Sequence, residues 1–213
     1  QPTKQGYTFA GWYTEQNGGG SQIKFGTTGQ TIYNPAVPGA HTLYAKWTVN
    51  QYVVVFVTNG GSPVNDITQN YGTNFTFPTT TMEGYTFFAW YENTELTLGE
   101  HKPGTQGTIT AETKYYYAKW TPHTYTVQYN GNGATSGTMQ DTNFVYGVWQ
   151  NLATNGYSRT GYSFSGWNKV ADGSGESYVQ NQNVRNLTSV DGARITLYAQ
   201  WSANNYTVKY NAN

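Results

Sequence analysis

Apolar and polar residues alternate over short stretches of this chain, which is the pattern of half-buried β-strands. In the segment LYAKW at residues 43–47, leucine, alanine and tryptophan fall on one face of a strand, and tyrosine and lysine fall on the other. No stretch repeats apolar residues at i, i+3, i+4 and i+7 over three turns, as an amphipathic helix would. The pattern therefore predicts a protein built mostly from strands.

Three phrases recur along the chain, so an array of internal repeats is predicted. The closing phrase is LYAKW at 43–47, YYAKW at 116–120 and LYAQW at 197–201. The middle phrase is GYTFAGWY at 6–13, GYTFFAWY at 84–91 and GYSFSGWN at 161–168. The opening phrase is QYVVVFVTNGG from 51, TYTVQYNGNGA from 124 and NYTVKYNAN from 205.

The order of these phrases divides the chain into copies of one unit. We expect the later part of a first copy at 1–48, a complete second copy at 51–121, a complete third copy at 124–202 and the first strand of a further copy at 205–213. Four residues separate the closing tryptophan of one copy from the opening tyrosine of the next. Such a linker spans at most about 15–18 Å, so neighbouring copies should touch or nearly touch, as in repeat proteins coupled to their nearest neighbours.

The middle phrase carries an irregularity. In GYTFAGWY, strict alternation puts Trp12 on the face opposite Phe9, and a β-bulge at Gly11 would turn Trp12 back toward the core. The second copy has Ala89 at the glycine position, so we expect that a small residue is needed there, under an aromatic ring, rather than a left-handed conformation. We expect the repeated tryptophans to be core residues: Trp12, Trp90 and Trp167 of the middle phrase, and Trp47, Trp120 and Trp201 of the closing phrase.

Composition narrows the choice of function. The 213 residues include 11 basic and 11 acidic ones, so there is no basic surface to neutralise phosphates, and we expect no nucleic-acid partner. No apolar run reaches the roughly 18 residues of a membrane span, so we expect no membrane insertion. The chain has no cysteine, so each copy must be held by packing of its 36 aromatic residues (20 tyrosines, 9 phenylalanines and 7 tryptophans), each of which can bury about 150–250 Å².

The succession of YTVxYNxNGG, GYTFxGWY and LYAKW resembles the Listeria–Bacteroides repeat, also called the internalin B-repeat family, over essentially the whole chain. The resemblance implies a compact β-grasp-like α+β domain with little helix, arranged in tandem. It also implies large secreted or cell-wall-anchored bacterial surface proteins, in which such repeats serve as stalk or adhesion modules and share no catalytic residues. This chain departs from the pattern at Ala89, at Asn168 in place of tyrosine and at Gln200 in place of lysine.

Reactive residues do not gather in the repeat, so no catalytic residue, cofactor or metal site is predicted. His41, His101 and His123 occupy unmatched positions, and the acidic residues scatter likewise. The stretch Asp172–Glu176 (DGSGE) is weakly similar to a calcium-binding loop, but it lacks the regular acidic spacing and the distal glutamate. We interpret it as a glycine-rich hairpin loop.

Two sets of outward residues are candidate contact surfaces. Tyr44, Tyr117 and Tyr198 recur where strand alternation expects solvent, and they suit either stacking on sugar rings or ordinary cross-strand pairing. Val53, Val55 and Val57 also point outward, where the third copy has Thr126 and Gln128. Three aligned valines suggest a face that is covered by a neighbouring repeat or by a partner.

These observations predict a spacer, or stalk, segment of a secreted or cell-wall-anchored bacterial adhesin outside the cell. The alternative is a module on the same scaffold that binds a glycan or a host protein. Neighbouring repeats of the same chain are the expected partners. The incomplete first copy leaves two possibilities open: a second molecule supplies its 205–213 strand, or the sequence is a window on a longer array.

Overall fold

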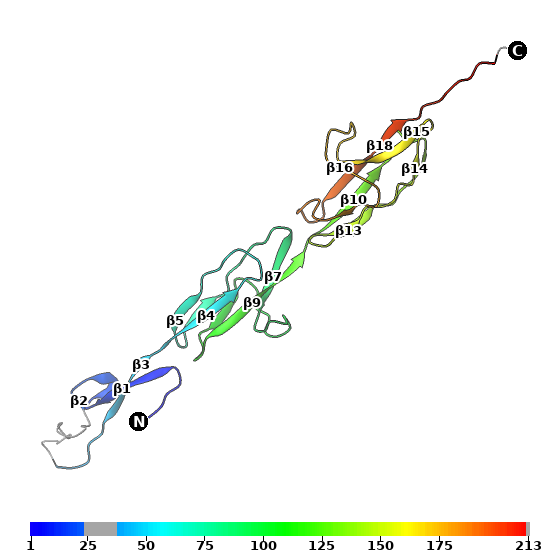
Figure 1. Cartoon of the computed structure of the whole chain (residues 1–213). Helices are drawn as coiled ribbons and strands as arrows, with labels where there is room; N and C mark the ends of the chain where they lie inside the picture. The colour runs from blue at the N-terminus through cyan, green and yellow to red at the C-terminus, as the bar shows by residue number, and fades with distance from the viewer. Residues whose placement is uncertain (24–37, 212–213) are drawn as a thin grey trace. The chain divides into compact units, whose positions relative to one another are not determined.

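The computed structural model describes residues 1–23 and 38–211 (Figure 1). They group into two compact units, Gln1–Thr80 with Phe88–Lys119, and Thr81–Phe87 with Trp120–Asn213. One 3₁₀ turn, η1 (Gln16–Gly18), is the only helical element in the described part of the chain, and all other regular structure is strand. The prediction of a mostly-β repeat protein is confirmed.

The first copy forms a small antiparallel sheet. Its strands are β1 (Tyr7–Tyr13), β2 (Gln22–Ile23) and β3 (Tyr44–Val49), in the order β2-β1-β3. The register of β1 on β3 shifts between Phe9 and Gly11, which leaves Ala10 as an extra residue and sets Trp12 opposite Ala45. The bulge expected at this glycine is therefore present. Residues 24–37 of this copy lie outside the described residues.

The second copy has a mixed sheet. Its strands are β4 (Gln51–Val57), β5 (Ile67–Asn70), β6 (Asn74–Thr76), β7 (Tyr85–Tyr91), β8 (Gln106–Thr108) and β9 (Lys114–Pro122). The sheet order is β5-β4-β9-β7, with β4 antiparallel to β5 and parallel to β9, while β6 and β8 form a separate ribbon. The opening strand thus lies in the middle of the sheet beside the closing strand, as in a β-grasp domain.

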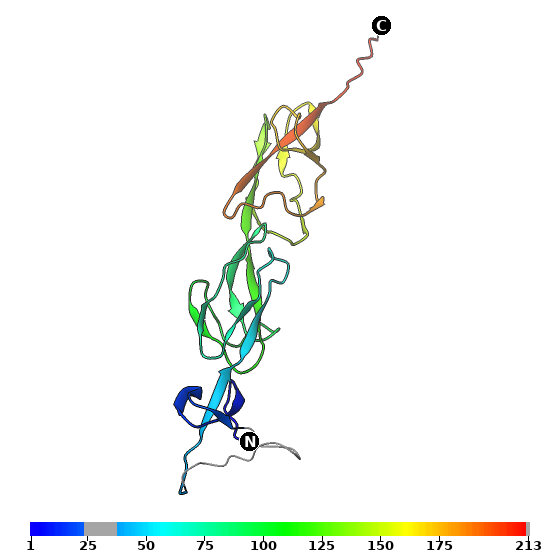
Figure 2. The same cartoon turned by 90° about the vertical axis from the view of Figure 1, so that its left-hand side faces the viewer.

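The third copy repeats this arrangement. Its strands are β10 (Thr124–Asn130), β11 (Ser136–Gly137), β12 (Thr142–Val145), β13 (Gln150–Asn151), β14 (Tyr157–Ser158), β15 (Tyr162–Asn168), β16 (Ser177–Tyr178), β17 (Asn183–Val184) and β18 (Arg194–Ala203). The main sheet runs β12-β10-β18-β15-β16, and Figure 2 shows β10 and β18, which pair in parallel, side by side. The pairs β11-β14 and β13-β17 form two short ribbons.

Alternation places the aromatic residues of the complete copies in the interior. Trp90 and Trp167 are both 0% exposed, as expected. The core of the third copy is made of ten buried residues: Tyr125, Val127, Tyr129, Phe144, Leu152, Trp167, Tyr178, Val184, Leu197 and Ala199. The closing tryptophans are only partly buried, and the indole N–H of Trp201 donates to the Gly131 carbonyl oxygen, 3.0 Å away. They close the core at its margin.

The turn after each opening strand is tied to the closing strand. Asn59 and Asn132 take left-handed conformations, with φ of 49° and 45°. Their side-chain amides donate to the carbonyl oxygens of Ala118 and Ala199, each over 2.8 Å. Asparagine thus suits both the positive φ of the turn and a fixed acceptor on β9 or β18.

The bulge glycine has a different neighbour from the one expected. Gly166 has φ of +148°, and a Cβ there would lie 2.8 Å from the backbone carbonyl oxygen of Tyr178. Two expectations for this position are therefore wrong in the third copy. The backbone of β16, and not an aromatic ring, lies against the glycine, and the glycine does adopt a positive φ, as Gly11 does with φ of +133°. In the second copy, β7 pairs with β9 on one side, and next to Ala89 its other side forms an isolated bridge from Trp90 to His101. Ala89 is fully buried.

Residues 204–211 pair with no strand among the described residues, and Tyr206, Val208 and Tyr210 are exposed. Residues 212–213 lie outside the description. That 205–213 opens a further copy stays a prediction.

Candidate functional site: the joints between copies

The three outward tyrosines lie on three different strands, one in each copy. Tyr44 lies on β3, Tyr117 on β9 and Tyr198 on β18, and each is partly buried. Each therefore belongs to the outer face of its own copy, where Tyr44 stands opposite Tyr13 and Tyr198 opposite Asn168. Their role in ligand contact stays a prediction.

The valines do gather on one sheet face. Val53, Val55 and Val57 are partly buried on β4, and the parallel register places Val55 beside Tyr115 and Val57 beside Tyr117. Side chains of paired residues point to the same face, so this face of the second copy is apolar. Tyr115 is 50% exposed and was missed, because sequence reasoning compared only the five residues of the closing phrase.

The most distinctive shared geometry lies where one copy passes into the next. The closing strand β3 ends at Val49 and β4 begins at Gln51, so Asn50 alone joins them. Likewise β9 ends at Pro122 and β10 begins at Thr124, with His123 between them (Figure 1). We call the surroundings of Asn50 the first joint and those of His123 the second joint. Each lies within one of the two compact units.

In the first joint, Asn50 is bonded to both copies. Its backbone N–H donates to the Gly6 carbonyl oxygen over 2.9 Å, and its own carbonyl accepts from the Tyr71 N–H over 2.8 Å. The Thr8 hydroxyl donates to Asn50 Oδ1 over 2.6 Å. The linking residue therefore has no unpaired backbone group, and it cannot turn without breaking bonds on both sides.

Tyr71 of the second copy also packs against the middle phrase of the first. Its ring lies against Gly6 so closely that a Cβ on Gly6 would overlap the ring carbons. The rings of Tyr7 and Tyr71 meet edge to face, with centroids 6.0 Å apart and planes at 76°. Gly6 also has φ of +77° in a turn closed by a hydrogen bond from the Tyr7 N–H to the Lys4 carbonyl. Two constraints thus require glycine here: the positive φ of the turn and the tyrosine from the next copy.

The second joint repeats these contacts. The backbone N–H of His123 donates to the Gly84 carbonyl over 2.8 Å, and its carbonyl accepts from the Tyr146 N–H over 2.8 Å. A Cβ on Gly84, where φ is +73°, would overlap the ring of Tyr146. That ring meets Tyr85 edge to face, with centroids 5.5 Å apart. In both joints, a tyrosine of the following copy therefore packs on the glycine and the tyrosine that open the GYTF phrase.

The third copy presents the same turn without a ring on it. Gly161 has φ of +80°, its carbonyl accepts from the Asn204 N–H over 2.9 Å, and the Ser163 hydroxyl donates to Asn204 Oδ1 over 2.7 Å. Within the described residues, nothing lies within 4 Å of where a Gly161 Cβ would be. The third copy therefore separates the two constraints on this glycine. Gly161 has the positive φ of the turn, but no tyrosine ring lies against it within the described residues.

In the second joint, the linking side chain bonds a loop of the following copy as well as the copy before it. His123 Nδ1 lies 2.7 Å from the Ser189 carbonyl oxygen, and its Nε2 lies 3.0 Å from the Thr86 hydroxyl. A carbonyl can only accept, so Nδ1 carries a proton; when Nε2 carries none, it accepts from the Thr86 hydroxyl. The Thr124 N–H also donates to Asp191 Oδ1 over 2.9 Å. The loop before β18 thus clamps the second joint.

The DGSGE loop is organised by hydrogen bonds within the protein. The buried Asn168 Nδ2 donates to the carbonyls of Gly173 and Gly175. The hydrogen bond from Lys169, 2.7 Å away, lowers the pKa of the Glu176 carboxyl. Asp172 Oδ1 accepts from the Ser174 N–H. No cluster of three or more His, Asp or Glu side chains able to hold a metal occurs among the described residues.

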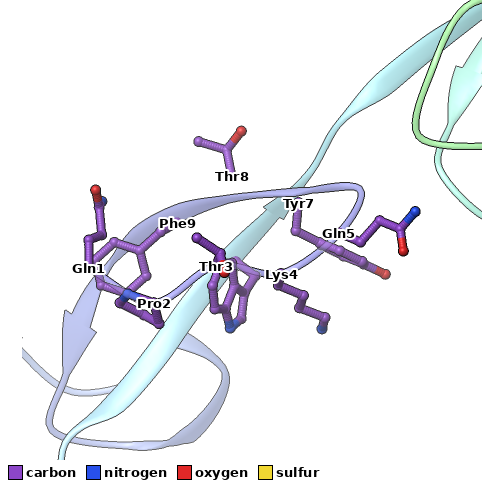
Figure 3. A pocket seen from close by; sticks show the side chains of 9 residues that line it. Gln1, Pro2, Thr3, Lys4, Gln5, Tyr7, Thr8 and Phe9 are labelled. Carbon is purple, nitrogen blue, oxygen red and sulfur yellow. The ribbon is translucent and has the colours of Figure 1, made fainter.

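A hollow of about 510 Å³ lies beside the first copy, between residues 1–9 and Trp47 (Figure 3). Phe9 and Trp47 meet there edge to face with centroids 5.6 Å apart, and Phe164 and Trp201 meet at 5.8 Å in the third copy. In that copy the Trp201 indole bonds the turn after the opening strand. The rings that line the hollow therefore match the partly buried rings at the margin of the core in a complete copy.

Fold and joints together define the chain as a tandem array of small β-domains, each continuing directly into the next. The profile of the Listeria–Bacteroides repeat domain matches residues 1–46, 52–119 and 125–200, and the chain belongs to this family.

Curated relatives extend the similarity. A protein of Evansella cellulosilytica, whose name proposes a membrane protein, is 33% identical over 96% of this chain and 29% of its own length. A second protein of that organism, whose name proposes a glycine-rich membrane protein, is 31% identical over 99% of this chain and 22% of its own length. Internalin H of Listeria monocytogenes is 32% identical over 63% of this chain and 24% of its own length.

The chain thus spans less than a third of the length of the relatives it matches. No helix within residues 1–23 and 38–211 has the length and apolar character needed to cross a membrane.

Proposed function

We propose that this segment is a non-enzymatic spacer in a bacterial surface protein, and that its joints hold successive repeats in a preferred orientation. The observation that carries the proposal is the same set of contacts at two joints. One residue links the copies, both of its backbone groups are bonded, and a tyrosine of the following copy packs on a glycine. A linker meant only to tether domains would leave its backbone solvated and flexible.

The extracellular setting is part of the proposal. Membership in the Listeria–Bacteroides family and the similarity to internalin H support a place on the cell surface, either wall-anchored or secreted. Few ionisable groups and close aromatic packing fit a role in which contacts bear load and no reaction occurs. Adjacent repeats of the same chain are then the principal partners.

The test compares orientation across a joint with and without its ring contact. We expect residual dipolar couplings of the two complete copies in the intact chain to fit one shared alignment tensor. In a Tyr146→Ala variant the couplings should need two tensors, because the second joint loses the ring while each copy keeps its core. Exposed Tyr115→Ala is the matched control and should preserve a single tensor. Independent tumbling of the wild-type copies would refute the spacer role.

A binding module is the second candidate, and one observation favours it. Trp149 is 59% exposed on the third copy, whereas the tryptophans of the middle phrase in both complete copies are fully buried. An indole of this exposure contributes little to folding and is a common anchor for ligands.

A further inference from the structure

The two-stranded ribbon β13–β17 of the third copy has one face in the core and one outside. Gln150 pairs with Val184, and Asn151 pairs with Asn183. Val184 is buried, and side chains alternate along a strand, so Asn151 and Asn183 point outward. One residue beyond the pairs, Trp149 and Arg185 lie on that same outer face.

Trp149 and Arg185 are in contact. The guanidinium carbon of Arg185 lies 4.9 Å from the Trp149 ring centroid, a cation–π distance. The cation covers one face of the indole, and the ring is nevertheless 59% exposed, so its other face is open to solvent.

Planar amides continue the row beside this pair. Asn183 Nδ2 donates to Asn151 Oδ1 over 2.6 Å, which leaves the amide N–H groups of Asn151 and the carbonyl oxygen of Asn183 for an external partner. Further along, the Thr154 hydroxyl donates to Asn181 Oδ1 over 2.7 Å. The outer face thus presents an indole ring, a guanidinium group and side-chain amides, one after another along the ribbon.

The turn that carries Trp149 is braced from both sides. The Gly147 N–H donates to Asn186 Oδ1 over 2.6 Å, and the Val145 N–H donates to Gln150 Oε1 over 2.7 Å. Gln150 Nε2 donates in turn to the Asn143 carbonyl over 3.2 Å. The backbone that carries Trp149 is therefore fixed before any ligand arrives, which lowers the entropic cost of binding.

The second copy shows that the fold does not need this pair. Its ribbon β6–β8 sets Asn74 opposite Thr108 at the matching position, and the Thr108 hydroxyl donates to Asn74 Oδ1 over 2.9 Å. A small polar pair closes the ribbon there equally well. The exposed tryptophan and arginine are therefore additions of the third copy.

Charge selects the class of ligand. The five ion pairs found among the described residues involve other cations, so no carboxylate of that part of the chain neutralises Arg185. We propose that the outer face of the β13–β17 ribbon binds an acidic sugar. One of its pyranose rings stacks on the open face of Trp149, the carboxylate of an adjoining ring reaches past the edge of the indole to Arg185 on the other face, and hydroxyls bond Asn151 and Asn183. This inference rests on the binding-module candidate and not on the spacer role.

The experiment consists of two NMR titrations of the whole chain. One uses a trimer of galacturonic acid, and the other uses the neutral galactose trimer for comparison. We expect the acidic trimer to shift the Trp149 indole N–H signal with saturation at millimolar concentration, and to bind about tenfold more tightly than the neutral trimer. Trp149→Ala should abolish binding of both sugars. Arg185→Gln should remove the preference for the acid while weak stacking persists.

Matched controls keep the result specific. Tyr115→Ala, which removes another exposed aromatic ring, and Asn74→Ala, at the matching ribbon position, should leave binding unchanged. Equal affinity for the two trimers would overturn the acidic class. Absence of any shift at millimolar sugar, or undiminished binding by a folded Trp149→Ala variant, would overturn the site. None of these outcomes bears on the alignment tensors that test the spacer.

Discussion

The two joints share a frame and differ in what surrounds it. In both, a single residue carries bonds to the glycine before it and to the tyrosine after it, and that tyrosine covers the glycine. In the first joint the linking residue is Asn50, whose side chain accepts only from the copy before it and approaches the Tyr52 hydroxyl at 3.5 Å. In the second it is His123, whose ring bonds the copy before it and also the Ser189 loop of the copy after it.

This difference separates what every joint needs from what one joint adds. The backbone bonds and the ring on glycine are common, so they set the geometry. The loop of the third copy that reaches His123 and Thr124 lies between β17 and β18, and among the described residues it braces the second joint alone. An array can therefore repeat the same contacts at each joint while further bonds differ from joint to joint.

The largest expected effect comes from the covered glycines. Gly84→Ala should destabilise the chain by about 3 kcal/mol, because alanine is strained at φ of +73° and its Cβ overlaps the Tyr146 ring. Gly161→Ala should cost only about 1 kcal/mol, because the turn strain is the same but no ring lies there. Urea denaturation of the two variants measures the difference. Equal losses would mean that the tyrosine does not press on the glycine.

The next effect comes from the rings themselves. Tyr146→Ala should cost about 2 kcal/mol of coupling in the second joint through lost burial and edge-to-face contact with Tyr85. Tyr71→Ala should free the first joint more completely, because no loop within residues 1–23 and 38–211 clamps Asn50 as the Ser189 loop clamps His123. Hydrogen exchange of the Asn50 and His123 amides reports each opening. Faster exchange at His123 than at Asn50 in these variants would reverse the ranking of the joints.

Exchanging the linking residues tests the added bond directly. His123→Asn keeps the backbone bonds and loses the one to Ser189, so the second joint should weaken by about 1 kcal/mol. Asn50→His should not stabilise the first joint. Exchange rates of the amides near residue 190 provide the measurement. Unchanged protection in His123→Asn would show that Asp191 and the backbone hold the loop without the imidazole.

The smallest expected effect on stability comes from the interiors of the copies and not from the joints. The core tryptophan is paired with His101 in the second copy and with Tyr178 in the third. Burial raises the pKa of Tyr178 to about 12 from its ordinary value near 10. The unfolded chain therefore releases this proton first, so stability is full below pH 10 and falls as the pH rises toward 12.

Tyr178→Phe should lessen this alkaline loss. At neutral pH it should cost nothing, since the buried hydroxyl has no hydrogen-bond partner in the described residues. Denaturation midpoints across this pH range, with exposed Tyr115→Phe as the control, provide the measurement. If the Tyr178→Phe variant loses as much stability at alkaline pH as the parent chain, other tyrosines cause that loss.

Much of the fold was visible in the residue pattern. Alternation in LYAKW and YTVxY predicted the buried faces, since Tyr116 and Leu197 are buried and Lys119 and Gln200 are less so. The bulge before Trp12 was also predicted from a single break in alternation. What packs against the bulge glycine was not predicted. In the third copy β16 lies against Gly166, and alternation along one strand does not encode which other strand will lie beside it.

Paired departures from the repeat pattern acquired a cause only in three dimensions. Lys119 lies over the Tyr91 ring, with Nζ 4.9 Å from its centroid, as Lys46 does over Tyr13. In the third copy Asn168 and Gln200 replace both partners together, and Asn168 organises the loop that follows it. The two substitutions had looked independent in the sequence because their positions belong to different phrases.

The sequence by itself determined the repeat, its strands and their inner faces. Strand alternation has a period of two residues, so it is written in neighbouring positions. Tertiary structure alone decided why the middle phrase begins with glycine and tyrosine. The ring that covers the glycine belongs to the following copy, and a contact between residues so far apart leaves no local pattern. The same holds for Trp149 and Arg185, which become one surface only when β13 pairs with β17.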